Sequence, residues 1–194
     1  MQSKRADVRI IESETLSDNW YILKKFTFDL QRRDGEWQRQ NREVYDRGNG
    51  ATILLYNRDK KTVILTRQFR FPVFINGHED DLIEAAAGLL DNMDPESRIK
   101  AEVEEETGYS VSRVEKIFEA YMSPGSVTEK LYFYLAEYQP KDRTSEGGGL
   151  KTEGEDIDVL EMTLEEALRG IETGRIVDGK TIMLLYHVAL KGIL

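Results

Sequence analysis

Hydrophobic and polar positions alternate near the N-terminus in the pattern that is typical of a β-hairpin. The apolar positions of the first predicted strand are Trp20, Ile22, Phe26, Phe28 and Leu30. Asp34-Gly35 is a hairpin-turn sequence, and residues 37–45 can return antiparallel to the first strand. The glycine-rich segment 46–50 then breaks the pattern, and its spacing predicts a plain turn rather than a dinucleotide-binding loop. We therefore expect a small N-terminal domain over residues 1–45 and a larger domain over residues 46–194.

Short apolar runs in the larger domain predict the strands of one mixed β-sheet. The runs extend from Ala51 to Tyr56, Thr62 to Phe69, Leu131 to Tyr138 and Ile157 to Met162. Continuous apolar runs of this length are typical of strands whose two faces are both covered. Residues 163–174 and 181–190 have the periodicity of amphipathic helices. The polar segment 141–154 contains three consecutive glycines and predicts a mobile loop. These elements together predict an α+β fold.

A third predicted helix carries a cluster of glutamates in its last turns. It begins behind Asp94, a good N-cap, and ends at Gly108, while Glu102, Glu105 and Glu106 share one of its faces. Like charges at i,i+4 and acids at a helix C-terminus each cost about 0.3–1 kcal/mol. A bound hard cation such as Mg²⁺ or Mn²⁺ would offset this repulsion. The alternative interpretation is a solvated acidic face.

Composition narrows the class of protein without identifying it. The chain has 194 residues, no cysteine and a net charge of -9. The absence of cysteine excludes disulfides and thiolate metal sites and fits a reducing compartment, so we expect the cytoplasm. No segment resembles a signal peptide or approaches the roughly 20 apolar residues that span a membrane. The negative charge argues against binding to nucleic acid, whereas a small phosphorylated ligand is compatible with it.

The glutamate helix and the loop before it resemble the Nudix box. In that family the motif reads glycine, five residues, glutamate, seven residues, and then Arg-Glu-U-x-Glu-Glu-x-Gly-U, where U is apolar. The positions filled here are Gly88, Glu102, Val103, Glu105, Glu106, Gly108 and Tyr109. The chain departs from the motif because the interval between Gly88 and Glu102 is one residue short. In addition, Asp94 stands at or near the first glutamate and Ala101 replaces the arginine.

The missing arginine is the departure with the largest consequence, because in the family it orients the glutamates. Arg98 lies one turn before Glu102 on the same helix face, whereas Lys100 points elsewhere. We therefore expect Arg98 to form the ion pair that the box arginine would otherwise form.

The similarity extends over nearly the whole chain and points to the branch of the Nudix family that hydrolyses nucleoside diphosphate sugars. The segments that carry it are residues 42–56, 67–70, 121–125, 155–157 and 178–181. The resemblance implies an α/β/α sandwich and metal-dependent cleavage of a pyrophosphate bond, with GDP-mannose giving GMP and mannose 1-phosphate. Pro124 resembles a proline of members that act on ADP-sugars, so ADP-ribose hydrolysis is an alternative. A non-catalytic module that binds a nucleotide sugar is a second alternative, because the box arginine is missing.

The resemblance also implies which residues bind the metal, with Mg²⁺ expected and Mn²⁺ as an alternative. The implied ligands are the main-chain carbonyl of Ala87 and the side chains of Glu102, Glu106 and Glu155. Glu105 shares their helix face and is a further catalytic candidate. A general base is expected on the glycine-rich loop, where Glu153 and Glu155 are both candidates. We favour Glu155 because it adjoins a predicted strand and is better anchored.

Further residues are implied to bind the substrate, some of them from the partner subunit of a homodimer. The candidates within one subunit are Arg70, Gly88, Leu89, Glu129 and Lys180. The candidates that reach the nucleotide from the partner are Trp20, Asn41, Arg42 and Glu43. Structural roles are the alternatives, with Arg70 as an exposed strand-end residue and Trp20 as part of a core. The two histidines, His78 and His187, are too few and too scattered for a zinc site.

Overall fold

The computed structural model describes residues 7–194, apart from the side chain of Glu153, and consists of two compact units. The N-terminal unit contains the residues up to Asn49 together with the segment Tyr121–Lys130. The larger unit contains Gly50–Ala120 and Leu131–Leu194. The domain boundary at residue 45 stays a prediction, because compactness does not show that either part folds alone.

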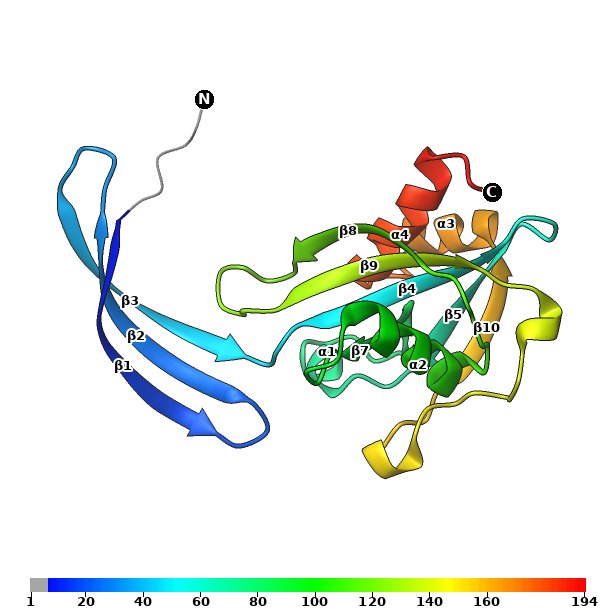
Figure 1. The fold of residues 1–194 in the computed structure, drawn as a ribbon, viewed down its shortest axis with the longest axis horizontal. Helices are drawn as coiled ribbons and strands as arrows, with labels where there is room; N and C mark the ends of the chain where they lie inside the picture. The colour runs from blue at the N-terminus through cyan, green and yellow to red at the C-terminus, as the bar shows by residue number, and fades with distance from the viewer. Residues whose placement is uncertain (1–6) are drawn as a thin grey trace. The chain divides into compact units, whose positions relative to one another are not determined.

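The N-terminal unit is a three-stranded antiparallel sheet with the strand order β1-β2-β3 (Figure 1). Its strands are β1(Val8–Asp18), β2(Ile22–Gln31) and β3(Trp37–Asp46). The predicted hairpin corresponds to β2 and β3, and Gly35 has a φ of +90° in the turn between them. We did not predict β1, because two register irregularities interrupt its pairing with β2 and disturb the alternation of its sequence.

The larger unit is built on a seven-stranded mixed sheet with the strand order β10-β5-β4-β9-β8, and with β6 and β7 paired to β5 and β4. Its strands are β4(Gly50–Asn57), β5(Thr62–Gln68), β6(Leu82–Glu84), β7(Ala86–Leu89), β8(Glu115–Tyr121), β9(Lys130–Glu137) and β10(Asp158–Thr163). Strands β4 and β9 are parallel, whereas β5 is antiparallel to both β4 and β10. The sequence predicted β4, β5, β9 and β10, but the short β6 and β7 and the more polar β8 were missed.

The three longer helices of the larger unit begin behind residues whose side chains cap them, whereas the short helix α1 was not predicted. The helices are α1(Phe71–Ile75), α2(Pro95–Thr107), α3(Leu164–Glu172) and α4(Gly179–Leu190), with two 3₁₀ turns, η1(Pro140–Asp142) and η2(Lys151–Glu153), in the polar segment. The Asp94 carboxylate accepts hydrogen bonds from the first-turn amides of α2, and Gly108 ends that helix with a φ of +77°. Asp178 caps α4, so α4 begins two residues before the predicted start at Thr181.

Helices cover both faces of the larger sheet. In Figure 1, α2 lies on one face and α3 and α4 lie on the other. All eight residues of β4 are buried, as expected for a central strand of such a sandwich. On the α2 face, Ile53 of β4 packs in a core cluster with Ile99 and Val103 of α2. The α+β fold and the sandwich are therefore confirmed.

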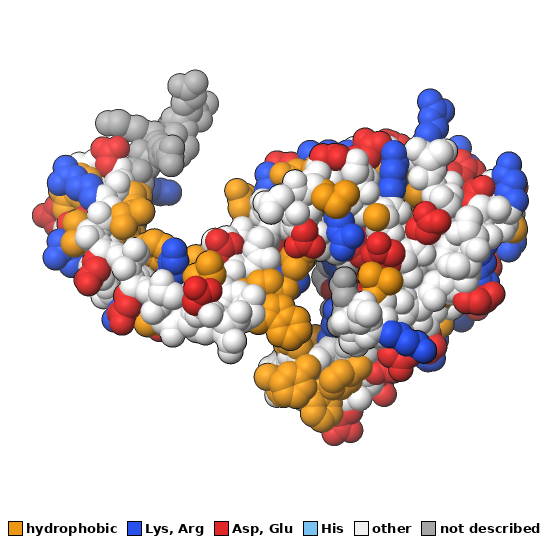
Figure 2. Space-filling model, turned by 60° about the horizontal axis from the view of Figure 1, so that its bottom comes forward, with side chains coloured by type: hydrophobic (Ala, Val, Ile, Leu, Met, Phe, Trp, Pro, Cys, Tyr) orange, Lys and Arg blue, Asp and Glu red, His pale blue; other side chains and the backbone are white. Residues whose placement is uncertain are grey.

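Charged side chains of both signs lie on the surface of the larger unit. Figure 2 shows acidic and basic side chains interspersed on the face of the larger unit that it presents. Among the residues that the structure describes, no helix is long and apolar enough to cross a membrane.

Candidate active site

Two buried glutamates on α2 form the centre of the candidate site. Glu102 is 6% exposed and Glu106 is 2% exposed. The Oε2 atom of Glu106 has no hydrogen-bond partner among the described residues. Burial, followed by repulsion from Glu102 and Glu155, raises the pKa of Glu106 well above its ordinary value of 4.5. A buried carboxylate oxygen without a donor is the kind of atom that a cation would satisfy.

Strand β7 approaches α2 so closely that a side chain at residue 88 would collide with the side chain of Glu102. A Cβ atom on Gly88 would lie 1.6 Å from Oε1 of Glu102, which is far inside van der Waals contact. The main chain of β7, including Ala87 and Leu89, therefore runs directly beside the Glu102 carboxylate. This approach explains why the motif requires a glycine here, and it brings the predicted carbonyl ligand and a predicted glutamate ligand onto neighbouring elements.

Arg98 forms the ion pair that we predicted for it. Its Nη2 atom lies 2.5 Å from Oε1 of Glu102, and its Nη1 atom lies 3.7 Å from Oε2 of Glu105. Its Nε atom donates a hydrogen bond of 3.0 Å to the carbonyl of Leu89. Lys100 instead pairs with Glu96 at 2.6 Å, away from the glutamate cluster. Arg98 thus connects α2 to β7 and orients two of the glutamates.

Two predicted substrate-binding cations share one buried carboxylate that sequence reasoning missed. Glu84, at the end of β6, is 3% exposed and lies with its Oε1 atom 2.6 Å from Nε of Arg70. Lys180 at the start of α4 pairs with Oε2 of the same carboxylate. The positive charge of Arg70 offsets part of the rise in the pKa of Glu106, which indicates that Arg70 lies close to the glutamates of α2. The sequence distinguishes Glu84 only as an acidic residue that follows two apolar ones, Leu82 and Ile83.

The glycine-rich loop packs against the C-terminal end of α2. The amides of Gly148 and Gly149 donate to the carbonyls of Glu106 and Glu105, at 2.9 and 3.1 Å. These bonds satisfy carbonyls at the end of the helix that have no partner within it. Gly147 has a φ of +70°, and a Cβ atom there would lie 2.5 Å from the Glu106 carbonyl oxygen. These bonds join part of the glycine-rich segment to α2, and the mobility of the segment stays a prediction.

The two candidate general bases, Glu153 and Glu155, lie between the consecutive glycines and β10. Glu155 is partly exposed, and its Oε2 atom accepts a hydrogen bond of 2.8 Å from the Leu150 amide. Its carboxylate also contributes to the raised pKa of Glu106. Glu153 ends η2, and its side chain lies outside the described residues.

The side chains present fit a divalent cation as a partial ligand set. Among the described residues, no group of three or more histidine, aspartate or glutamate side chains is placed to hold a metal ion. Glu102 and Glu106 nevertheless offer buried carboxylates, one of them with an unpartnered oxygen. Mg²⁺ is commonly bound by one or two carboxylates together with waters and substrate phosphates, so these two carboxylates are compatible with such a site.

The other predicted substrate contacts belong to the N-terminal unit. Trp20 lies before β2 and is 83% exposed, so the alternative of a core tryptophan was wrong. Asn41 accepts a hydrogen bond of 2.8 Å from the Thr27 hydroxyl. The other three are exposed or paired on the surface: Arg42 bonds to the Asn41 carbonyl and Gln40, Glu43 is exposed, and Glu129 lies 3.5 Å from Arg47. Their roles with substrate stay predictions.

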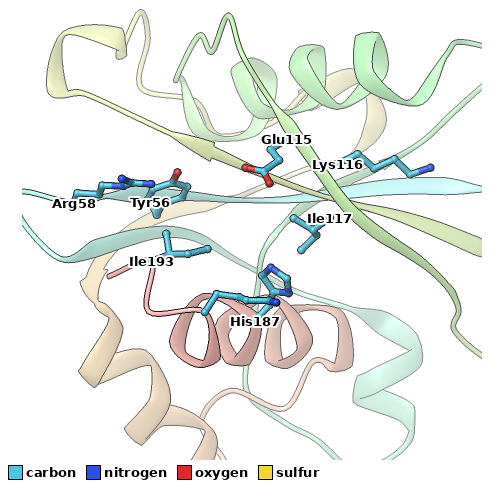
Figure 3. Close-up of a pocket in the computed structure, with 8 residues that line it drawn as sticks. Tyr56, Arg58, Glu115, Lys116, Ile117, His187 and Ile193 are labelled. Atoms are coloured by element: carbon cyan, nitrogen blue, oxygen red, sulfur yellow. The ribbon is translucent and has the colours of Figure 1, made fainter.

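A separate pocket of the larger unit contains none of the predicted site residues (Figure 3). It is lined by Tyr56, Arg58, Glu115, Lys116, Ile117, His187, Lys191 and Ile193. The ring of His187 lies 5.8 Å from that of Phe118. The predicted metal ligands therefore lie outside this pocket.

Comparison with known proteins identifies similar sequences and a similar fold. Residues 7–45 match the family described as the GDP-mannose pyrophosphatase NudK N-terminal domain. A GDP-mannose pyrophosphatase from Pectobacterium atrosepticum is 58% identical over 95% of both chains. One from Enterobacter sp. is 54% identical over 96% of this chain and 97% of the relative. A crystal structure of an ADP compounds hydrolase has a TM-score of 0.73 at 18% identity and covers 98% of both chains, which shows a shared fold.

Proposed function

We propose that this chain, which belongs to the GDP-mannose pyrophosphatase family of Nudix hydrolases, cleaves GDP-mannose to GMP and mannose 1-phosphate. The observation that carries this proposal is the buried pair Glu102 and Glu106 beside Gly88, with one carboxylate oxygen that lacks a donor among the described residues. A buried pair of like charges is unfavourable unless a cation joins it. Pyrophosphate substrates are anions that such a cation would help to bind.

Nudix hydrolases require a divalent cation, and we assign Mg²⁺ to this enzyme, with Mn²⁺ as the alternative. The residues that would hold it are the main-chain carbonyl of Ala87 and the carboxylates of Glu102, Glu106 and Glu155. A cation held there would supply positive charge to stabilise the developing charge on the phosphate oxygens and would favour the loss of a proton from the attacking water. Arg98 keeps the Glu102 carboxylate directed toward β7, which fits a role in preparing the ligand set.

Catalysis then depends on where the chain holds its base and its cations. Water attacks one phosphorus atom, the bond from that phosphorus to the bridging oxygen breaks, and the attacking water loses a proton to a general base. Glu155 is our candidate for this base, because its carboxylate is close enough to Glu106 to raise the pKa of that residue. Arg70 and Lys180 bind the phosphate oxygens as cations.

The proposed enzyme acts as a cytoplasmic homodimer. The N-terminal sheet leaves several large apolar side chains exposed, among them Ile10, Ile11 and Trp20. A small sheet that leaves such side chains exposed is stabilised when a further surface buries them, and a second subunit would supply that surface. Trp20, Asn41, Arg42 and Glu43 would then contact the nucleotide bound by the partner, with Trp20 stacked on the base.

A panel of nucleotide sugars with Mg²⁺, scored for phosphomonoester release, tests the proposed reaction. We expect GDP-mannose to have a kcat/KM at least about tenfold higher than ADP-ribose, because a site that loses a base-specific hydrogen bond leaves a buried group unpaired. Equal rates for the two would assign the chain to a broader nucleotide-sugar hydrolase. Binding of the nucleotide sugars without release of any phosphomonoester would support a non-catalytic module.

A further inference from the structure

We infer that Glu84 is a positioning residue for substrate, which holds Arg70 and Lys180 side by side so that both cations bind the pyrophosphate. This inference rests on the proposed function, because that function supplies the pyrophosphate. Glu84 itself does not touch the phosphates in this arrangement. It acts through the two cations that it binds.

The geometry around Glu84 brings three distant segments together. Its Oε1 atom lies 2.6 Å from Nε of Arg70, and its Oε2 atom accepts from Nη2 of Arg70 at 3.4 Å and pairs with Nζ of Lys180. Lys180 also lies 3.1 Å from Oδ2 of Asp178, the N-cap of α4. Next to Glu84, the Ala85 amide donates to the Thr181 hydroxyl at 2.7 Å, which ties the end of β6 to α4.

Burial shows that the carboxylate lies beneath its cations. The side chain of Glu84 is 3% exposed, whereas those of Lys180 and Arg70 are 11% and 39% exposed. Burial raises the pKa of Glu84, but Lys180 and Arg70 outweigh it, so that the pKa is lowered and the group is ionised at neutral pH. Arg70, the more exposed of the two cations, therefore lies outside a charged carboxylate that binds both of them.

Arg70 retains donors for a second anion. Its guanidinium has five N–H donors, and the bonds to Glu84 use Nε and Nη2. No acceptor within the described part of the chain bonds to Nη1, which is free to donate to a phosphate oxygen. Glu84, which holds this guanidinium, lies three residues before Ala87, the proposed main-chain ligand of the cation, so the two cations and the metal site share one stretch of chain.

A purely structural role for Glu84 is the alternative, in which it only neutralises two buried cations. The two roles differ in what they predict for anion binding. A structural carboxylate affects the stability of the fold, whereas a positioning carboxylate also affects the affinity for pyrophosphate when the fold is intact.

Calorimetric titration with inorganic pyrophosphate and Mg²⁺ distinguishes these roles. We expect Glu84→Gln to raise the Kd at least about tenfold relative to the wild type, because the amide does not hold both cations. The matched control is Glu161→Gln, since Glu161 also accepts from a lysine, Lys60 at 2.9 Å, and from the Tyr138 hydroxyl. We expect this control to change the melting temperature and leave the Kd for pyrophosphate unchanged.

A double-variant comparison tests whether Glu84 acts through Arg70. In the double variant Glu84→Gln/Arg70→Ala, the fold-increase in the Kd for pyrophosphate should be clearly smaller than the product of the fold-increases in the two single variants. If Glu84→Gln does not fold, Glu84→Asp replaces it, because it retains the charge but is too short to reach both cations. Wild-type affinity in a folded Glu84 variant, losses that multiply, or no binding of pyrophosphate to the wild type would each overturn the inference.

The same measurements separate this inference from the proposed function. If the expected pattern of pyrophosphate affinities appears but the wild type cleaves no nucleotide sugar, the proposed reaction fails and the role of Glu84 in anion binding stands. If GDP-mannose is cleaved while Glu84→Gln leaves the Kd for pyrophosphate unchanged, the reaction stands and the inference fails.

Discussion

At the scale of single residues, the site combines charges that repel one another with a small number of groups that hold them in place. Glu102 and Glu106 are buried close together, and Arg98 provides a cation within 2.5 Å of Glu102. Ala101 stands where the family motif has an arginine, so Arg98 performs this pairing from a position one turn earlier. A guanidinium at this place both neutralises a carboxylate and fixes its direction.

Replacing Arg98 tests whether this residue takes over the role of the arginine that the motif has at position 101. We expect Arg98→Ala to lower turnover and weaken Mg²⁺ affinity by roughly 10–100-fold, the usual range for groups that orient metal ligands. Lys100→Ala is the matched control, because Lys100 lies on the same helix but pairs with Glu96. Arg98→Ala combined with Ala101→Arg should restore part of both properties. Full activity and metal affinity in Arg98→Ala would show that Glu102 needs no orienting arginine.

Glu106 gives a prediction about stability and pH. Its pKa is raised in the folded, metal-free protein, chiefly by burial and then by Glu102. The folded state therefore binds the proton more tightly than the unfolded state, and the free energy of unfolding falls as pH rises from the ordinary value of 4.5 toward the raised pKa. Glu106→Gln should lose this part of the pH dependence, keep or gain stability without metal, and lose most turnover.

Denaturant titrations of both proteins across this pH range, with and without Mg²⁺, measure the effect. The wild type should gain more stability from the cation than Glu106→Gln does, because a specific ligand stabilises the folded state that binds it. Near-normal activity in the variant would remove Glu106 from the metal site.

At the scale of elements, α2 meets neighbouring backbone beside Glu102 and at its C-terminal end. Near Gly88, strand β7 lies against the Glu102 side chain, and at the C-terminal end the glycine-rich loop bonds to the carbonyls of Glu105 and Glu106. The loop that carries Glu155 is thus joined to the helix that carries the other glutamates. Their relative positions depend on glycines, because a side chain would separate the two backbones.

Gly147→Ala tests this close approach. Its backbone has a φ of +70°, and the added Cβ atom would lie 2.5 Å from the Glu106 carbonyl oxygen. The matched control is Gly174→Ala, since Gly174 has a φ of +76° and no described atom within 4 Å of an added Cβ. Both variants should be destabilised by about 1–2 kcal/mol from the left-handed backbone alone. In urea denaturation, Gly147→Ala should lose more free energy of unfolding than Gly174→Ala, and it should also lose activity. Equal losses of stability in the two variants would contradict the close approach of the loop to α2.

At the scale of the whole molecule, the question is how the N-terminal sheet serves the larger unit. The segment Tyr121–Lys130 joins this sheet at Tyr45, whose amide donates to the Ser126 carbonyl at 2.8 Å. The exposed face of the sheet and the exposed Trp20 are the features that favour a second subunit.

Deleting residues 1–45 tests the proposed homodimer. The truncated protein should be monomeric in light scattering and should bind GDP-mannose more weakly, because it has lost both the sheet and the residues expected to contact the nucleotide. Trp20→Ala in the full-length chain is the companion variant, which should remain dimeric and raise the KM. A full-length monomer, or a truncated chain with full activity, would refute this arrangement.

The caps of α2, the buried strand β4 and the glutamate cluster were predictable from the sequence, because each depends on residues that are neighbours along the chain or along one helix. Asp94 and Gly108 act within a turn of the helix that they limit, and Arg98 reaches Glu102 across one turn. The sequence by itself therefore determined where the acids lie and which cation pairs with them.

Only the tertiary structure decided what surrounds that cluster. Glu84 binds Arg70 across 14 residues and Lys180 across 96 residues, and no local pattern encodes such a pairing. The same holds for Gly88, whose need for a glycine arises from a helix that begins seven residues later. Short strands such as β6 bury too few residues to show a periodic pattern, so their partners become visible only when the sheet has formed.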